Sequence, residues 1–166
     1  MSDSPYPFTN FNFSVEISVP GLKSPLCKAS FSDCDGLEMS MEPKTVQEGG
    51  MNLQQTHLVG PVRYGQLTLR RGMTDNLDLW KWFLYAAQPG HIAAAQGQVT
   101  LMDAAGQERI TFVLADCLPV KMRGPSFNAK DGQVAIEEMQ LVYASMEVRL
   151  PGSSGLSLGI SAGIGV

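Results

Sequence analysis

The side chains that most often perform chemistry are few in this 166-residue chain, and none lie together in a recognisable pattern. Two histidines, His57 and His91, have no cysteine or carboxylate at ligand spacing, so we expect no metal site. Three cysteines, Cys27, Cys34 and Cys117, are an odd number without paired spacing. We expect them to be buried, reduced thiols rather than a disulfide framework, and we expect no cofactor.

Nucleophilic and acid–base catalysis also lack their sequence context. No Gly-x-Ser-x-Gly motif precedes a helix, and the glycine-rich segments near Gly49 and Gly152 lack the lysine of a phosphate loop. The adjacent carboxylates Glu137 and Glu138 would point to opposite faces of a strand, so they cannot act together as acid and base. They indicate a bulge or an interface ion pair instead. We expect that the protein is not an enzyme.

Two adjacent arginines, Arg70 and Arg71, end a short apolar strand, and their side chains should face opposite sides of it. One interpretation leaves one guanidinium in solvent while the other caps a carbonyl. The alternative is that one arginine forms an ion pair with Asp75, Asp78 or a glutamate of a neighbouring subunit. Arg70, Arg71 and Asp75 are therefore candidate residues of a corner between subunits.

The bulk composition bounds the class of partner. Twelve basic and sixteen acidic residues give a formal charge of 12 − 16 = −4, which argues against tight nucleic-acid binding. The N-terminus has no signal-peptide pattern, and no apolar run is long enough to span a membrane. We expect assembly in the cytoplasm without a membrane anchor.

Apolar residues at alternate positions predict a mainly β fold with one helix. The first strand alternates strictly, and the last, longest pattern changes its apolar parity twice, which indicates bulges or burial of both faces. The fold class is predicted as an antiparallel β-barrel or sandwich with one flanking helix over residues 1–150. The strands are expected at residues 11–19, 37–42, 67–69, 99–103, 109–122 and 134–150. One buried face of 109–122 is expected to carry Ile110, Phe112, Leu114, Leu118, Val120 and Met122.

The helix is predicted over residues 75–87. Thr74 or Asp75 can cap it, Asp78 places a carboxylate in its first turn, and Pro89-Gly90 ends it. Residues at helical spacing predict one buried face. That face is expected to contain Leu77, Trp80, Phe83 and Leu84.

Residues 47–64 form a polar, glycine-hinged segment with few sizeable apolar side chains. Long loops without structure of their own are uncommon and are usually functional or disordered. We predict an arm that packs on another molecule. Its candidate contact residues are Glu48, Gly49, Gly50, Met51, Asn52, Leu53, Gln54, Gln55, His57 and Leu58.

Residues 151–166 form a Gly/Ser-rich tail in which apolar residues alternate from Leu156 to Val166. A plain flexible linker would not need this alternation. The tail is either a disordered end or an additional strand that pairs with an exposed sheet edge.

An ordered series of segments resembles the tail tube protein family of contractile phage tails and related extracellular contractile injection systems. The resemblance covers roughly residues 8–148 and is strongest in the long segment that begins at Leu58. The matching segments are Phe13–Ile17, Phe31–Met39, Val46–Asn52, Leu58–Asp75 followed by Leu79–Trp82, Pro119–Lys121 and Ala135–Tyr143.

The resemblance implies hexameric rings whose strands join into one inner β-barrel. The rings would stack into a rigid hollow tube that sheath contraction drives through a target envelope, as a conduit for cargo effectors or DNA. The implied partners are further copies of the chain, a sheath protein, baseplate and spike-hub proteins and a tube terminator. The arm, taken as residues 46–64, would contact the neighbouring ring, and the helix would lie outside the barrel.

Two other hypotheses remain open at this point. A tube initiator or baseplate ring would share the fold but occur in a single layer. A soluble ligand- or cargo-binding β-barrel belongs to another class of protein. The parent particle, a phage tail or a cell-derived injection device, also stays open.

Overall fold

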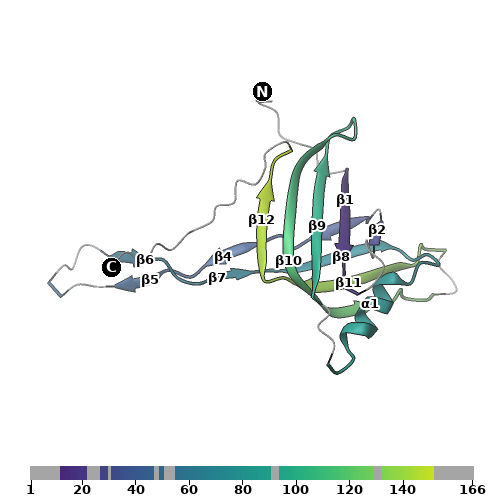
Figure 1. Ribbon diagram of the computed structural model, residues 1–166, viewed down its shortest axis with the longest axis horizontal. Coiled ribbons are helices and arrows are strands. Elements are labelled where there is room, and N and C mark those ends of the chain that lie inside the picture. The colour runs from purple at the N-terminus through teal and green to yellow at the C-terminus, as the bar shows by residue number, and fades with distance from the viewer. Residues whose placement is uncertain are drawn as a thin grey trace.

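The computed structural model describes residues 12–21, 27–29, 31–46, 49–50, 55–90, 94–128 and 132–151. It shows two crossing antiparallel layers, one helix beside them, and a two-stranded ribbon that projects far from the rest (Figure 1). The elements are β1 (Phe13–Ser18), β2 (Cys27–Ala29), β3 (Asp33–Asp35), β4 (Met39–Met41), β5 (Lys44–Val46), β6 (Thr56–Leu58), β7 (Val62–Tyr64), β8 (Gln66–Gly72), α1 (Asp78–Ala86), β9 (Ala95–Met102), β10 (Glu108–Arg123), β11 (Ile136–Val142) and β12 (Ser145–Arg149).

The first layer contains β2, β1, β9 and the first half of β10, with β12 on the other side of β10. Its strands β1 and β9 are alternating segments of the sequence, because one face of each is buried. In β1 the predicted face is confirmed: Val15 and Ile17 are almost fully buried, and Val19 just beyond the strand is buried too. The predicted hairpin of residues 99–103 with 109–122 is the β9–β10 pair.

The second layer contains β3, β8, β11 and the second half of β10. The long strand β10 therefore belongs to both layers and turns from one to the other (Figure 1). Its irregular point is Asp116, whose φ of 53° is positive, beside a register shift between Leu114 and Cys117. A bulge at a corner of this kind bends the strand and leaves one residue unpaired.

The bulge at Asp116 explains why one prediction about β10 was wrong. Leu118 and Val120 were expected on the buried face, but they are exposed, while Cys117 and Pro119 are buried. An extra residue in a strand reverses which side chains face the core, so parity read across the bulge fails. The expected burial of Leu114 is confirmed.

The predicted last strand, residues 134–150, is divided into β11 and β12. The division falls at Ala144, whose amide donates to the carbonyl of Ala115 across the bulge. Met139 and Leu141 are buried before it, and the partly buried Met146 packs against the core after it, which accounts for one parity change. The other parity change arises at Ile136, which is exposed, so its position does not mark a buried face.

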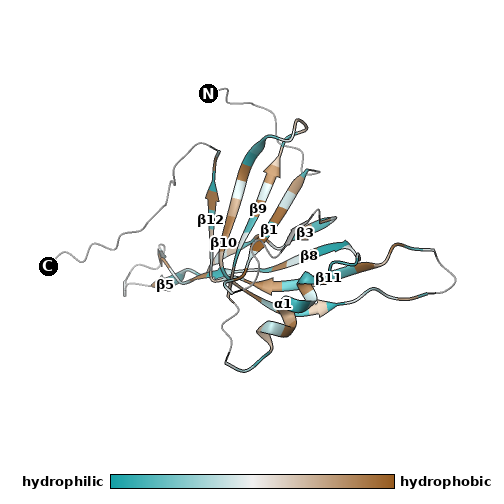
Figure 2. Cartoon of the chain, turned by 45° about the vertical axis from the view of Figure 1, so that its right-hand side comes forward, coloured by the Kyte–Doolittle hydropathy of each residue, from teal (hydrophilic) through white to brown (hydrophobic). Residues whose placement is uncertain are grey.

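The core lies between the two layers and is closed at one end by α1. Figure 2 shows apolar positions alternating with polar ones along the strands of both layers. Burial of this apolar surface is the main favourable contribution to folding. The most buried large side chains are Trp82, Ile17, Leu67, Leu69, Leu79, Leu114, Met139 and Leu141.

The helix is shorter than predicted, and its buried face differs from the predicted one. It begins at Asp78, because Asn76 Oδ1 accepts the Asp78 amide, and neither Thr74 nor Asp75 caps it. Leu79 and Trp82 face the core, whereas Leu77 and Leu84 are exposed, with Leu84 62% accessible. The prediction of Leu77 and Leu84 as packing residues was wrong.

The buried face of α1 was predicted wrongly because of the composition of the helix. Both of its sides carry large apolar residues, so the 3.6-residue period fits more than one buried face. Trp80 and Phe83 are partly buried, as expected of a flanking position, and Phe83 packs against the core. Asp78 lies in the first turn as predicted.

The second predicted strand lies in the projecting ribbon and not in the domain. Residues 37–42 were expected to bury one face in the domain, but Met39 and Met41 belong to β4, which pairs with β7 outside it. Farther out, β5 pairs with β6. The arm is therefore an antiparallel ribbon from Met39 to Tyr64, longer than the predicted segment 47–64. We call this ribbon the arm below.

The predicted tail falls largely outside the described residues. Of the predicted tail, residues 151–166, only Pro151 is described. Within the described parts of the chain, no helix is long and apolar enough to cross a membrane.

Candidate functional site

The inner half of the arm has one apolar face and one polar face. Met39 lies opposite Tyr64 and Met41 opposite Val62, and opposed residues and those two apart share a face. Met39 and Met41 are 54% and 50% exposed. Ser40 and Arg63 occupy the other face, so the methionine face is free to be covered by another surface.

The outer half of the arm is exposed on both faces. In β5 and β6, Val46 lies opposite Thr56 and Leu58 opposite Lys44, and all four are exposed. Val59, just beyond β6, is even more exposed. Exposed methionine and valine side chains along a ribbon are typical of a protein–protein contact surface. A two-stranded ribbon is also only marginally stable alone in water, so contact with another surface would stabilise it.

Gly60 joins the two halves of the arm at a close approach of backbones. A Cβ built at Gly60 would lie 1.7 Å from the carbonyl oxygen of Glu42. Gly36 plays a similar part at the root, where φ is +99° and a Cβ would lie 1.9 Å from the carbonyl oxygen of Gln66. Only glycine fits these two positions, so the path of the arm depends on them.

Tyr143 holds the root of the arm to the core. Its buried hydroxyl accepts a hydrogen bond from the Glu38 amide at 3.1 Å. The hydroxyl also lies 3.1 Å from the carbonyl oxygens of Gly36 and of Glu38, to which it can donate. Its ring packs on that of Tyr64 with a centroid distance of 5.5 Å. The direction of the arm is thus fixed by a residue from the junction of β11 and β12.

The predicted arm residues divide into two groups. Gly49, Gly50, Gln55, His57 and Leu58 are all exposed, which is compatible with a contact surface.

Met39, Met41 and Val62, which form the apolar face of the arm, were not predicted from the sequence. A signal existed, because alternation on both sides of a glycine-rich segment is typical of a hairpin. Outside the described residues lie Glu48, Met51, Asn52, Leu53 and Gln54.

Arg71 lies in a buried network within the chain. Its Nε donates to Glu137 Oε1 at 2.5 Å, and another guanidinium nitrogen donates to the Asn76 carbonyl oxygen. Trp80 Nε1 donates to the other oxygen of Glu137 at 2.8 Å, and Arg71 stands over the Phe31 ring. The network connects β8, β11 and α1. Placing Arg71 at a subunit interface was wrong, because its ion-pair partner lies in its own core.

Arg70, on the opposite face, bridges the exposed carboxylate of Asp33 and the partly buried carboxylate of Glu138. Its guanidinium donates to Glu138 at 2.8 Å and to Asp33 at 2.9 Å. The hydrogen bond and charge of Arg70 lower the pKa of Glu138, and those of Glu138 raise the pKa of Arg70. The predicted corner residue Asp75 is exposed. Arg70 and Asp75 therefore stay candidates for contact with a neighbour.

The first layer has an unpaired edge and an open cavity beside its core face. No described strand pairs with the far edge of β12, where an unpaired row of backbone groups is a template for another strand. At one end of the layer lies an open cavity of about 470 Å³. Its lining is mostly apolar: Phe13, Leu37, Val99, Leu101 and Phe112, with Ser32, Asp33 and Cys34.

The described thiols, Cys34 and Cys117, are buried or partly buried and free. Burial, together with the nearby Asp33 and Asp35, raises the pKa of Cys34 to about 12, and burial raises the pKa of Cys117 to about 12, so neither is a thiolate at neutral pH. His57 lies on the exposed arm, 3.4 Å from Thr45 Oγ1. His91 lies outside the described residues, as does the side chain of Cys27. Across the described ranges, no cluster of metal-ligating side chains occurs.

The comparison with protein families decides the identity. The family model of the T4-like virus tail tube protein gp19 matches residues 9–147, most of the chain. The chain belongs to this tail tube protein family. It is a structural protein of the tube, which accords with its exposed arm and its lack of a catalytic constellation among the described residues.

Solved structures share the tail tube fold. A chain of the cryo-EM structure of the anti-feeding prophage baseplate is 24% identical, with a TM-score of 0.79, and the match covers 88% of this chain and 97% of that one. A chain of the sheath–tube complex of the PVC extracellular contractile injection system is 21% identical, with a TM-score of 0.76 and coverages of 88% and 93%. No curated protein sequence matches the chain.

Proposed function

We propose that this tail tube protein assembles into six-membered rings that stack into a hollow tube. The observation that carries the proposal is the arm, whose apolar face is uncovered and whose root is rigidly fixed. The sixfold symmetry of the similar baseplate particle supports the number of subunits in a ring. Identical subunits joined through different surfaces form closed rings when the rotation closes.

Within a ring, the free edge of β12 is proposed to pair with the β2 edge of the next subunit. Both edges belong to the first layer and lie at opposite ends of its strand order. Pairing would satisfy the free backbone groups and remove the exposed edges, which in a lone subunit would favour aggregation. The cavity beside Phe13 and Phe112 would be covered at the same time.

Between rings, the arm is proposed to lie on a subunit of the neighbouring ring. Its methionine face provides adaptable apolar contact, and the polar face with Arg63 and Glu42 would remain toward water. The candidate residues Glu48 to Leu58 would make the outermost contacts. Arg70 and Asp75 would serve as polar contacts between subunits.

The tube is proposed to work inside a contractile sheath and to be driven through a target envelope. Its further partners would be the sheath protein, baseplate and spike-hub proteins and a tube terminator. The similarity to tube, baseplate and terminator particles supports this set of partners. Assembly would occur in the cytoplasm, without enzymatic activity or a membrane anchor.

Deletion of residues 49–59 tests the role of the arm. The root, held by Tyr143, stays intact in this variant, so the domain should fold and form rings. Electron microscopy should show single rings in place of tubes. Tubes of normal length from the deletion variant would contradict the role given to the arm. If the unmodified protein forms only single rings, the role of tube initiator replaces that of repeating tube subunit.

A further inference from the structure

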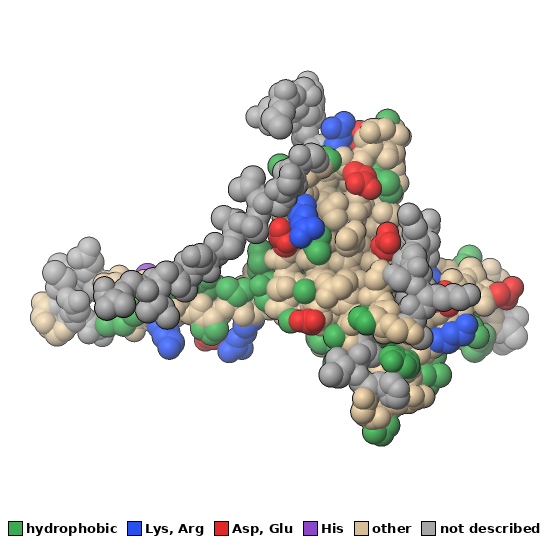
Figure 3. All heavy atoms as spheres, viewed as in Figure 1, with side chains coloured by type: hydrophobic (Ala, Val, Ile, Leu, Met, Phe, Trp, Pro, Cys, Tyr) green, Lys and Arg blue, Asp and Glu red, His purple; other side chains and the backbone are tan. Residues whose placement is uncertain are grey.

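The first layer has a free face that differs in chemistry from the free face of the second layer. The strand registers place twelve residues on this face, three from each of four strands. They are Ser14, Glu16 and Ser18 of β1, Gln96, Gln98 and Thr100 of β9, Thr111, Val113 and Ala115 of β10, and Ser145, Glu147 and Arg149 of β12. We call these twelve positions the polar face. Figure 3 shows it toward the viewer, with few coloured side chains among the tan.

The polar face is nearly neutral. Nine of its twelve positions are Ser, Thr, Gln, Ala or Val. The charged residues among them are Glu16, Glu147 and Arg149. Lys28 of β2 is the register partner of Glu16 and so lies on the same face, which gives a net charge of −2 + 2 = 0. Arg149 is already paired with Glu147 at 2.8 Å. None of the twelve positions holds an aromatic residue.

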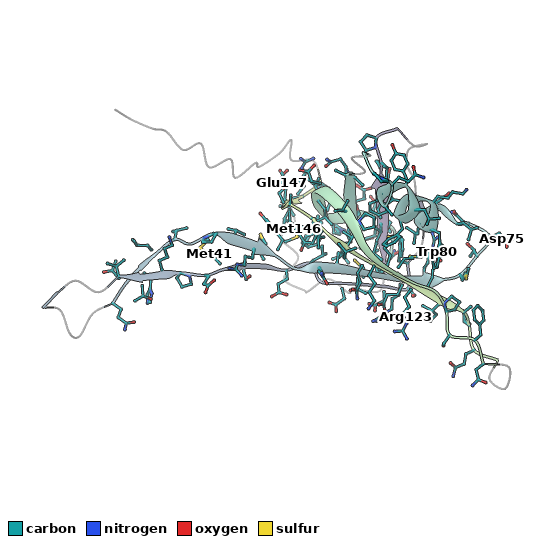
Figure 4. The ribbon with its side chains drawn as sticks, turned by 90° about the horizontal axis from the view of Figure 1, so that it is seen from below. Met41, Asp75, Trp80, Arg123, Met146 and Glu147 are labelled. Atoms are coloured by element: carbon teal, nitrogen blue, oxygen red, sulfur yellow. The ribbon has the colours of Figure 1, made fainter. Side chains whose placement is uncertain are left out.

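The opposite side of the protein has a different character. The free face of the second layer carries Arg70, Glu138 and Asp33 in ion pairs, with Arg123 nearby. Figure 4 shows Glu147 and Arg123 on opposite sides of the molecule. The two free faces are therefore distinguishable surfaces that would meet different surroundings in a tube.

The polar face is the one that can continue from subunit to subunit. The first layer ends in β12 on one side and β2 on the other, and neither outer edge is paired with a described strand. In the second layer, by contrast, α1 packs against β10. A closed ring built through β12 and β2 therefore presents one continuous sheet, whose core side is covered and whose polar side is free.

We infer, building on the proposed function, that the polar face is the wall of the channel and that the passenger in the channel is a polypeptide. Hydroxyl and amide groups such as those of Thr111 and Gln98 can donate and accept hydrogen bonds with peptide groups of any sequence. The absence of large apolar side chains from the twelve positions prevents tight adhesion. A passenger with varied charge thus meets a wall that neither traps nor repels it.

The same wall does not suit nucleic acid. Channels that bind single strands combine a positive groove with stacking aromatic residues, and the twelve positions provide neither. Binding to phosphates requires free Lys or Arg, whereas Arg149 is paired with Glu147 and Lys28 is the register partner of Glu16. A wall that only lets DNA slide should repel it through many carboxylates, whereas the net charge of this face is zero for each subunit.

Cysteine labelling tests the wall, in tubes first confirmed by microscopy. In the Gln98→Cys variant, the thiol should react with a small maleimide but not with a maleimide carried on a large dextran. Lys121→Cys, on the second layer, supplies the comparison, and the unmodified chain supplies the blank. Reaction of the Gln98→Cys thiol with both reagents, or with neither, would overturn the wall assignment. If no tubes form, the proposed function itself fails, which is a separate result.

Assembly in the presence of a probe tests the passenger. Tubes are polymerised with a labelled, unfolded, carboxymethylated polypeptide or with labelled single-stranded DNA of equal length, then treated with protease or nuclease. The polypeptide should be protected about tenfold more than the DNA, because the wall carries no net positive charge to hold phosphates. Equal or greater protection of DNA, or protection of neither probe, would overturn the assignment of a polypeptide passenger.

Discussion

Arg71 and Glu137 form a 2.5 Å ion pair at a site where their side chains are only 4% and 1% exposed. The pair joins β8 to β11 directly across their ladder, where the two residues are register partners. Trp80 adds the helix to the same carboxylate. One carboxylate therefore fixes the position of α1 relative to the sheet, with all of its buried charge compensated.

Removal of Glu137 should destabilise the subunit strongly. The Glu137→Met variant leaves the Arg71 guanidinium buried without its counter-ion, a change that costs about 3–5 kcal/mol in the free energy of unfolding. Urea unfolding of dissociated subunits measures this. The Arg71→Met, Glu137→Met double variant should be more stable than Glu137→Met alone. Glu138→Gln, at the partly exposed pair with Arg70, should have a much smaller effect. Equal losses for Glu137→Met and Glu138→Gln would contradict the account.

Loss of the Tyr143 hydroxyl should loosen the root of the arm. Tyr143→Phe keeps the ring but removes the partner of the Glu38 amide, at a cost of about 1 kcal/mol. Hydrogen exchange at the Glu38 amide should become faster while exchange in β1 stays unchanged. Tyr64→Phe is the matched control, because the Tyr64 hydroxyl has no hydrogen-bond partner among the described residues. An unchanged exchange rate at Glu38 in Tyr143→Phe would refute the anchoring role.

Gly60→Ala should disturb the arm and leave the domain folded. The new Cβ would meet the Glu42 carbonyl oxygen, so the two halves of the ribbon must separate at this point. The far-ultraviolet circular dichroism spectrum should be nearly unchanged, while sedimentation shows loss of tubes. Gly49→Ala is the control, since nothing lies within 4 Å of a Cβ there. Normal tube formation by Gly60→Ala would show that the bend is not required.

The buried face of α1 can be tested by a pair of truncations. Trp82→Ala removes a side chain with no exposed surface and should cost about 3–5 kcal/mol. Leu84→Ala, on the exposed side, should change stability by less than about 0.5 kcal/mol. Thermal unfolding of dissociated subunits measures both. A larger loss for Leu84→Ala would restore the face expected from the sequence.

The longer strands β1, β8 and β9 were the most predictable part of this fold, because each follows a period of two that one buried face imposes. The alternation of Phe13 to Val19 placed β1 correctly. The parity of Leu118 could not be predicted, since it depends on the bulge at Asp116, a local backbone conformation without a strong sequence signal. The phase of α1 was likewise undetermined, because its sides are both apolar.

The candidate site was predictable as a segment but not in detail. Polar residues and glycines identified the arm, yet its apolar face belongs to Met39 and Met41, which the same alternation assigned to a core strand. Alternation reports that one face is covered and does not say by which molecule. The Arg71–Glu137 pair joins residues 66 positions apart, and only the folded sheet brings them together.

Cryo-electron microscopy of the purified, assembled protein tests the central claim most directly. The account predicts stacked six-membered rings around an open channel, with β12 of each subunit paired to the β2 edge of the next and each arm lying on a subunit of the adjacent ring. A monodisperse monomer under all assembly conditions, or rings in which the β12 edge stays unpaired, would contradict it.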